Sequence, residues 1–147
     1  MKIIAHRGNI FGPSRDENRP EHIDRAISLG YDVEVDIHVD QETLLLGHDS
    51  GIYKVDMAWL TERKNRLWIH CKNFNALSLL SATDFNYFYH IDDPYTITSL
   101  GYIWTYPGQQ FTQNFVLVIP EIANIIPQKN IECCAVCTDY AHDWRLQ

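Results

Sequence analysis

The segment from Asp32 to Val39 constrains the fold of this chain more than any other. Valine and isoleucine alternate along it with Glu34, Asp36 and His38. Alternation with a period of two predicts a β-strand that has one apolar and one polar face. Carboxylates are costly to bury without partners, so the polar face needs water, a cation or a basic side chain.

Two further apolar segments carry polar residues in the same way. His70 and Lys72 share one face of a strand predicted over residues 67–71, and His90 and Asp92 share a face at the end of the segment 87–91. Such repetition is not expected from surface residues alone. It predicts a polar centre inside a barrel, whose apolar outer faces meet helices and whose functional groups lie at the carboxyl ends of the strands.

The 147 residues form a single expected domain, 1–147, which is short for an α/β barrel of about 250 residues. We therefore predict an α/β fold: an abbreviated TIM-type (β/α) barrel with about seven to eight mostly parallel strands and several helices shortened or missing. The core strands are expected over residues 2–5, 32–39, 67–71, 87–91, 102–105, 115–119 and 134–138, with a short extended run over 43–46. Helices are expected over 21–29, 56–64 and 75–82.

Charge and composition limit the partners. The net charge of −7, with no basic patch, argues against binding to a nucleic-acid backbone, but a bound cation would still permit a small phosphorylated substrate. No apolar stretch reaches the roughly 18 residues of a membrane span, and the chain enters a strand at once, without room for a signal peptide. We expect a cytoplasmic protein, in which Cys134 and Cys137 are buried thiols in an apolar strand.

Four short motifs carry the chemistry: His6-Arg7-Gly8, Glu17-Asn18, Glu34-Val35-Asp36 and Gly47-His48-Asp49. Together they bring two imidazoles and a pair of carboxylates close to the ends of predicted strands. Imidazoles titrate near neutrality, and carboxylates bind cations, so the set is suited to metal-assisted acid–base chemistry. Asp49 is expected to orient His48 or to cap the turn that follows it.

These motifs, in this order and spacing, resemble the signature of glycerophosphodiester phosphodiesterases over about the first 50 residues, and Lys72 fits a later lysine of the family. The resemblance implies a TIM barrel, a bound Mg²⁺ or Ca²⁺, and attack by a substrate hydroxyl that gives a cyclic phosphate. It also implies roles for individual residues. The metal ligands are Glu34 and Asp36, the catalytic residues are His6 and His48, the phosphate-binding residues are Arg7 and Lys72, and Asn18 supports the site on the substrate side.

The sequence departs from the family pattern at His70, where a further glutamate ligand is usual. Imidazole is a poorer ligand than carboxylate for Mg²⁺ or Ca²⁺ and a better one for Mn²⁺. Three explanations stay open: His70 is itself a ligand with an altered metal preference, Glu121 compensates as a ligand, or metal binding is weakened. The later part of the chain is much reduced, and His90 and Trp104 are its candidate substrate contacts.

We therefore expect a metal-dependent phosphoric diester hydrolase acting on a small glycerol- or polyol-containing phosphodiester by histidine acid–base catalysis. One alternative is a catalytically weak or inactive module that binds a phosphorylated ligand in the same pocket. Another is a lyase on a choline- or inositol-bearing lipid, which would need an exposed apolar rim near Ile52 and Tyr53 or near Trp104. The sequence leaves open the substrate alcohol, the metal and the oligomeric state.

Overall fold

The computed structural model describes residues 1–128 and 130–147 of the chain, and its centre is a ten-stranded sheet. Parallel strands follow one another across it in the order β6-β5-β2-β1-β10-β9-β8. Short β7 extends this order by pairing antiparallel with β8. The bounds are β1 Lys2–His6, β2 Asp32–Asp40, β5 Leu67–Cys71, β6 Tyr87–Phe88, β7 Tyr95–Ile97, β8 Ile103–Thr105, β9 Phe115–Val118 and β10 Ala135–Thr138.

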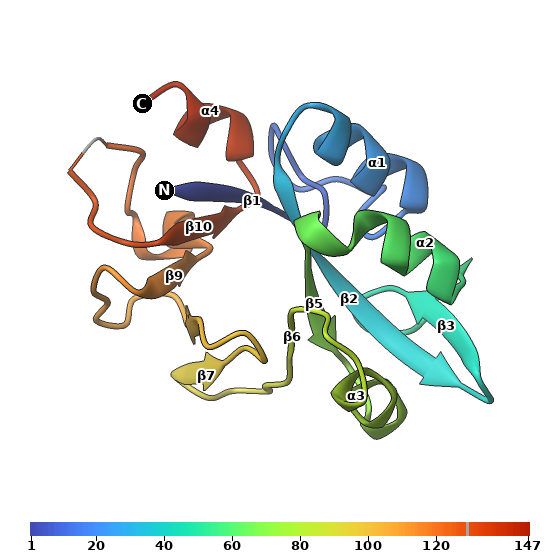
Figure 1. The fold of residues 1–147 in the computed structure, drawn as a ribbon. Coiled ribbons are helices and arrows are strands. Elements are labelled where there is room, and N and C mark those ends of the chain that lie inside the picture. Colours follow the sequence, from blue (N-terminus) through green and yellow to red (C-terminus); the bar gives the residue numbers. More distant parts are fainter. Residues whose placement is uncertain (129) are drawn as a thin grey trace.

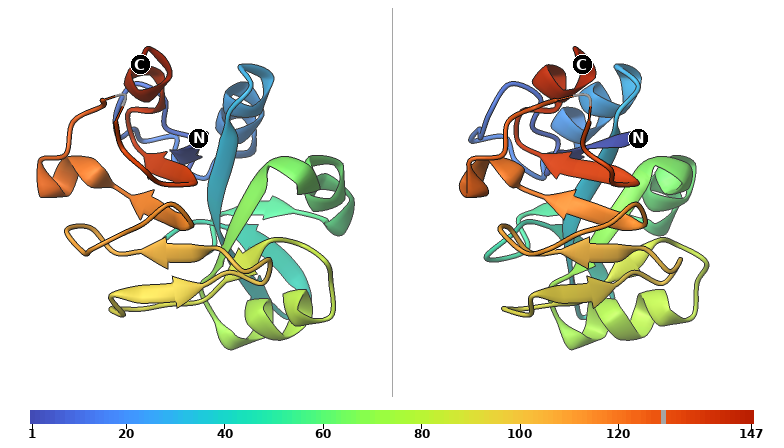
Figure 2. Two further views of the ribbon diagram at one scale, coloured as in Figure 1. Left: turned by 60° about the vertical axis from the view of Figure 1, so that its left-hand side comes forward. Right: turned by 90° about the vertical axis from the view of Figure 1, so that its left-hand side faces the viewer.

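The sheet curls so that β6 and β7 approach each other (Figures 1 and 2). Within the described residues no strand ladder joins these two, but side chains and loops do. The Ser99 N–H donates to the Tyr87 carbonyl at 2.8 Å, the Tyr87 N–H donates to Ser99 Oγ at 3.0 Å, and Thr96 Oγ1 donates to the Tyr89 carbonyl at 3.1 Å. We call this place the seam. The predicted abbreviated barrel of mostly parallel strands is confirmed.

Helices cover one side of the barrel: α1 (Pro20–Ser28), α2 (Met57–Arg63) and α3 (Phe74–Ser81), with a 3₁₀ turn η1 (Lys64–Arg66) after α2. The three predicted helices are confirmed with small shifts at their ends. The caps explain those ends, because the side chain of Asp56 accepts from the Trp59 N–H and that of Asn73 from the Ala76 N–H. A fourth helix, α4 (Ala141–Arg145), packs beside β1 and was not predicted from the sequence.

A hairpin of β3 (Thr43–Leu46) and β4 (Tyr53–Val55) extends from the end of β2. Ile37 pairs with Cys71 of β5 and also with Leu46 of β3, so the hairpin lies on the same side of β2 as β1, beyond the end of β1. The sequence predicted the run 43–46 but not its antiparallel pairing, nor β4. This arrangement brings the loop that begins at Gly47 over the carboxyl ends of the barrel strands.

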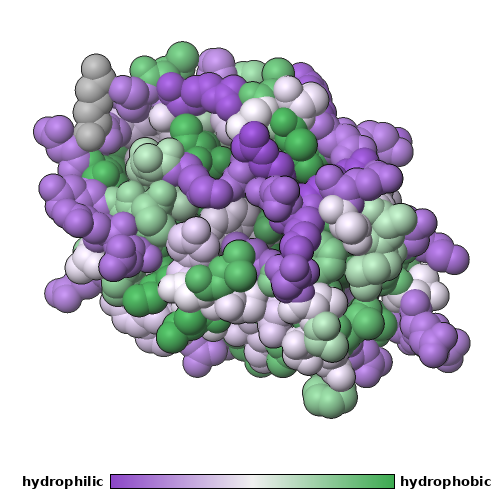
Figure 3. All heavy atoms as spheres, in the orientation of Figure 1, coloured by the Kyte–Doolittle hydropathy of each residue, from purple (hydrophilic) through white to green (hydrophobic). Residues whose placement is uncertain are grey.

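The side formed by β7, β8 and β9 carries no α-helix (Figure 2), and a 3₁₀ turn η2 (Pro120–Ala123) follows β9. A shallow apolar hollow on this side is lined by Tyr95, Ile97, Ile103, Phe111 and Phe115. On the face seen in Figure 3, separate apolar groups lie toward the centre and lower part, with hydrophilic side chains around them. This side therefore leaves apolar residues in water that a complete barrel would cover with helices.

Beside a small cluster that includes Leu117, Val136 and Trp144, two larger buried clusters hold the fold together. The larger one lies between the sheet and α1–α3 and includes Val35, Leu60 and Ile69. The other fills the barrel interior, where Trp68, Phe88 and Trp104 pack together. Over residues 1–128 and 130–147, no helix combines the length and apolar character required to cross a membrane.

Candidate active site

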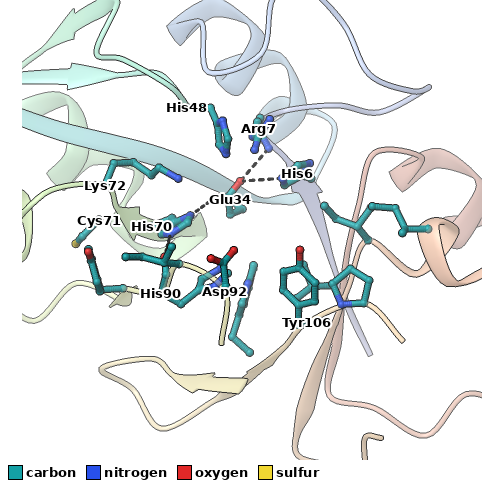
Figure 4. A pocket seen from close by; sticks show the side chains of 17 residues that line it. His6, Arg7, Glu34, His48, His70, Cys71, Lys72, His90, Asp92 and Tyr106 are labelled. Atoms are coloured by element: carbon teal, nitrogen blue, oxygen red, sulfur yellow. Dashed lines mark hydrogen bonds and ion pairs between the residues drawn. The ribbon is translucent and has the colours of Figure 1, made fainter. Parts of the chain in front are cut away.

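Two carboxylates and one imidazole meet at the carboxyl end of the barrel. Figure 4 shows two of the three side chains, Glu34 and His70. Glu34 and Asp36 project from β2 and His70 from β5, and all three side chains are buried. His70 Nδ1 lies 3.2 Å from Asp36 Oδ1 and 3.9 Å from Glu34 Oε1. The register explains this meeting, because Asp36 and His70 are paired across the parallel ladder and therefore point to the same face.

The donor set of this cluster fits a divalent cation. His70 Nε2 lies 3.2 Å from the His90 carbonyl oxygen, which only accepts, so a proton on Nε2 would leave the lone pair of Nδ1 to a cation beside the carboxylates. Asp36 Oδ1 is buried without a hydrogen-bond partner. Acceptors facing one another in a buried site need a positive charge between them. Asp36, Glu34 and His70 would hold that ion.

Two cationic side chains flank the carboxylates. Arg7 Nε lies 3.0 Å from Asp36 Oδ2, and Arg7 Nη1 donates to Glu17 Oε2 at 3.0 Å. The Arg7 backbone N–H, held by a left-handed φ of 52°, donates to Glu34 Oε2 at 3.2 Å. Lys72 Nζ lies 3.7 Å from Asp36 Oδ1. Both cations also line the cavity described below, so they are available to an anion.

The two carboxylates have opposite pKa shifts. Burial raises the pKa of Glu34, and the neighbouring charge of Asp36 raises it further. Burial alone would also raise the pKa of Asp36, but the adjacent His70, Arg7 and Asn18 lower it well below its ordinary range. Asp36 is therefore the carboxylate of the pair that stays ionised most readily. The ionised form of Glu34 is the one that an added cation would stabilise most.

His6 at the end of β1 is held by a carboxylate at the far end of the chain. Its Nδ1 lies 2.7 Å from Asp139 Oδ1, and Asn9 donates to the same oxygen at 2.8 Å. His6 Nε2 lies on the other side of the ring, 3.9 Å from Glu34 Oε2. Burial lowers the pKa of His6, but the Asp139 hydrogen bond and the charge of Glu34 outweigh it, so the pKa lies above its ordinary value. Asp139 thus fixes the ring and leaves Nε2 toward the cavity.

His48 is held in the same way by a near neighbour. Its Nδ1 lies 2.7 Å from Asp49 Oδ1, as expected from the sequence, and its side chain is 42% exposed. Gly47 precedes it with a φ of 149°, and a Cβ at Gly47 would lie 2.1 Å from the Ser50 carbonyl oxygen, so the loop needs glycine there. The Gly47 N–H donates to the Asp36 carbonyl at 3.1 Å, which ties the hairpin loop to the site.

One cavity of about 490 Å³, a size typical of small-ligand sites, is lined by His6, Arg7, Glu34, His48, His70 and Lys72, but not by the fully buried Asp36. His90 lies on its wall, stacked on His70 with ring centroids 4.8 Å apart. Burial and the neighbouring charges of His70 and Lys72 lower the pKa of His90 to about 4. Trp104 also reaches the cavity, but it is only 4% exposed and packs on Phe88 at 4.4 Å between centroids.

Two predicted site residues lie behind the cavity. Asn18 is 1% exposed; it donates to Asp36 Oδ2 and accepts from the Asp36 N–H, both at 2.9 Å, so it positions Asp36 and does not line the cavity. Glu121 directs both carboxylate oxygens at Thr138 Oγ1 and one of them at the Asp139 N–H. Its carboxylate therefore braces the end of β10, apart from the Glu34, Asp36 and His70 cluster.

Three residues that support the site, Asn9, Glu17 and Asp139, received no role from the sequence. Asn9 is fully buried and donates to Glu17 and Asp139, which connects the partner of Arg7 with the partner of His6. Glu17 belonged to a quoted motif, but its contact with Arg7 was not foreseen. Asp139 follows the last strand, and its position at a strand end was the one signal that could have placed it near His6.

Comparisons with known proteins give one structural likeness. The chain is similar in structure to a glycerophosphodiester phosphodiesterase from Parabacteroides distasonis ATCC 8503, with 11% sequence identity and a TM-score of 0.48. The likeness covers 99% of this chain and 95% of that one. A scan against protein-family models finds no match, and a search of curated proteins finds none.

Proposed function

We propose that the protein is a metal-dependent phosphodiesterase that cleaves a small glycerol- or polyol-containing phosphodiester. The observation that carries the proposal is the composition of a single cavity. It is lined by Glu34 and His70 of the acceptor cluster suited to a divalent cation, by two cationic side chains and by two histidines held by carboxylates. Each group answers one requirement of phosphodiester cleavage.

The first requirement is to bind an anion and to stabilise the charge on its oxygens. Arg7 and Lys72 would contact the non-bridging oxygens, and Glu17 and Asp36 hold Arg7 in place for this. A divalent ion bound by Glu34, Asp36 and His70 would supply further positive charge next to the phosphate. The imidazole in this set favours Mn²⁺ over Mg²⁺ or Ca²⁺ relative to an all-carboxylate site.

The second requirement is to move two protons. A hydroxyl of the substrate must lose one as it attacks phosphorus, and the leaving oxygen must gain one as its bond to phosphorus breaks. His6 and His48 would exchange these protons through Nε2, because Nδ1 of each ring lies against a carboxylate. Attack by a neighbouring hydroxyl gives a cyclic phosphate, which a later attack by water would open.

The proposal is tested by ³¹P NMR of the protein with a pool of glycerophosphodiesters and Mg²⁺, Ca²⁺ or Mn²⁺ in turn. We expect new cyclic-phosphate or monoester signals that are lost in the His6→Ala variant. His142→Ala is the matched control, since this histidine of α4 lies outside the cavity lining. No signal with any of the metals would contradict the enzyme and favour a module that only binds phosphorylated ligands.

The four cysteines are free thiols, and Cys71, Cys133 and Cys137 are buried. Burial raises the pKa of the Cys71 thiol to about 12, so this group stays protonated and unreactive. Free thiols suit a reducing compartment, and we place the proposed activity in the cytoplasm.

A further inference from the structure

The cavity has a wall that the proposed chemistry does not use. Opposite the charged groups, uncharged side chains follow the ends of β6, β8 and β9: Ile91, Tyr106, Pro107, Val118, Ile119 and Ile122. We call these six residues the apolar wall. Ile91 and Ile122 are about two-thirds exposed, at 67% and 68%, so the wall continues to the mouth of the cavity. An exposed apolar surface that continues into a polar site indicates a ligand with both characters.

Ile119, which belongs to the apolar wall, has an unfavourable backbone conformation. Its φ and ψ are 41° and 57°, the left-handed region that β-branched residues rarely adopt. Asn124 at the other end of η2 has a similar φ of 56°, and asparagine tolerates that region. Strain of this kind concentrates at functional sites, where a side chain is kept despite its backbone.

We propose, building on the phosphodiesterase function above, that the substrate is a phosphodiester with an alkyl group on one side of the phosphate, and that Ile119 selects it. The phosphate would lie on Arg7 and Lys72, and the alkyl group would pass along the apolar wall toward Ile91 and Ile122. The isoleucines and Pro107 offer no hydrogen bonds to a polyol, whereas they gain from covering methylenes. The preference rises by up to roughly fourfold for each buried methylene.

A cationic alcohol is the competing occupant, because Asp92 lies at the same cavity and Tyr89 and Tyr106 offer aromatic rings. Recognition of a quaternary ammonium group relies on several aromatic faces around the cation. Here most of the apolar wall is aliphatic, and Trp104 already packs on Phe88. The residues present therefore favour an alkyl group over a cation.

The test compares glycerol phosphodiesters that differ in the second alcohol: methanol, butanol, hexanol, glycerol and choline, all as soluble monomers. We expect kcat/KM to rise by several-fold or more from the methyl to the hexyl ester, with the hexyl ester above both the glycerol and the choline diester. The hexyl-to-methyl ratio should fall at least fivefold in Ile119→Gly, which removes the side chain and suits the backbone. Asn124→Gly is the matched control and should keep the ratio.

Two further measurements separate the possible failures. A thermal unfolding midpoint of Ile119→Gly no lower than the natural one shows that the variant folds; Ile119→Asn repeats the test with a second compatible residue. A flat series, or a choline ester above the hexyl ester, overturns the alkyl preference and leaves the phosphodiesterase intact. If no diester is cleaved, calorimetric titration with methyl and hexyl phosphate decides: tighter binding of hexyl phosphate supports the apolar wall, and equal affinity overturns it.

Discussion

The two sides of this barrel are built differently and contribute differently to the cavity. The side of β1, β2 and β5 is covered by α1–α3 and supplies His6, Glu34 and His70 to the lining. The side of β7, β8 and β9 has no covering α-helix and supplies much of the apolar wall. The comparison teaches that buried charged groups need strands that are held in place by covering helices, whereas apolar side chains can line the cavity from strands without such cover.

Chain length accounts for the difference between the two sides. A parallel crossover with a helix needs about a dozen residues or more, and the connection from β8 to β9 over 106–114 is too short for one. The connection after β9 holds Pro120 and Pro127, which oppose a long helix. By contrast, the connections after β1, β2 and β5 each hold a complete helix.

The largest expected effect tests whether catalysis belongs to the helix-covered side. His6→Ala should lower kcat/KM by about 10²–10⁴, because one of the two proton transfers loses its group. The ³¹P assay measures this, with His142→Ala expected to match the natural protein. An unchanged rate in His6→Ala would place the catalytic group elsewhere.

The second prediction compares stability on the two sides. Ile69→Ala removes a fully buried β5 side chain under the helices and should cost about 2–5 kcal/mol in the free energy of unfolding. Ile97→Ala acts on a β7 side chain that is 67% exposed and should stay within about 0.5 kcal/mol. Urea denaturation measures both, and equal losses would remove the distinction between the sides.

The third prediction concerns the metal ligands of the covered side. His70→Glu replaces an imidazole by a carboxylate and should shift the ratio of Mn²⁺ to Mg²⁺ affinity toward Mg²⁺ by roughly tenfold. Calorimetric titration with each metal alone gives the ratio without reference to activity. If the ratio does not change between the two proteins, His70 is not a ligand.

The smallest expected effects on stability concern the hydrogen bonds that connect each side of the barrel to neighbouring segments. Asn73→Ala removes a cap of α3 whose side chain also bonds the Val39 N–H at 3.2 Å, and should cost about 0.5–2 kcal/mol. Ser99→Ala removes two hydrogen bonds at the seam and should cost about 0.5–1.5 kcal/mol. Urea denaturation measures the free energy of unfolding of both variants. A larger decrease for Ser99→Ala would show that the seam contributes more to stability than the cap of α3.

Periodicity predicted the covered side of the fold well and the other side less well. The strand 67–71 was predicted at the bounds of β5, because Ile69 and Cys71 alternate with His70 and Lys72 there. The strand 87–91 is shorter in the structure, since β6 ends at Phe88. β7 was missed because three residues, two of them exposed, give no measurable alternation.

For the site, the sequence predicted the residues near the cavity better than their supports. His6, Glu34, Asp36 and His70 were chosen because charged groups on strands need an explanation. The Asp139 contact with His6 joins residues at opposite ends of the chain, and pairing over that separation leaves no local pattern. The contact depends on the parallel pairing of β1 with β10, which places Asp139, just after β10, beside His6 at the end of β1.

The packing of Trp104 gives the molecule an optical probe of its own. Of the four tryptophans, Trp104 is the one that lines the cavity, and its ring lies 6.0 Å from that of Trp68 between centroids. Indoles this close couple their strong electronic transitions, which produces a pair of opposite bands in the far-ultraviolet circular dichroism spectrum. A ligand that shifts Trp104 changes this signal without a label, so occupancy of the cavity is readable by spectroscopy in the natural protein.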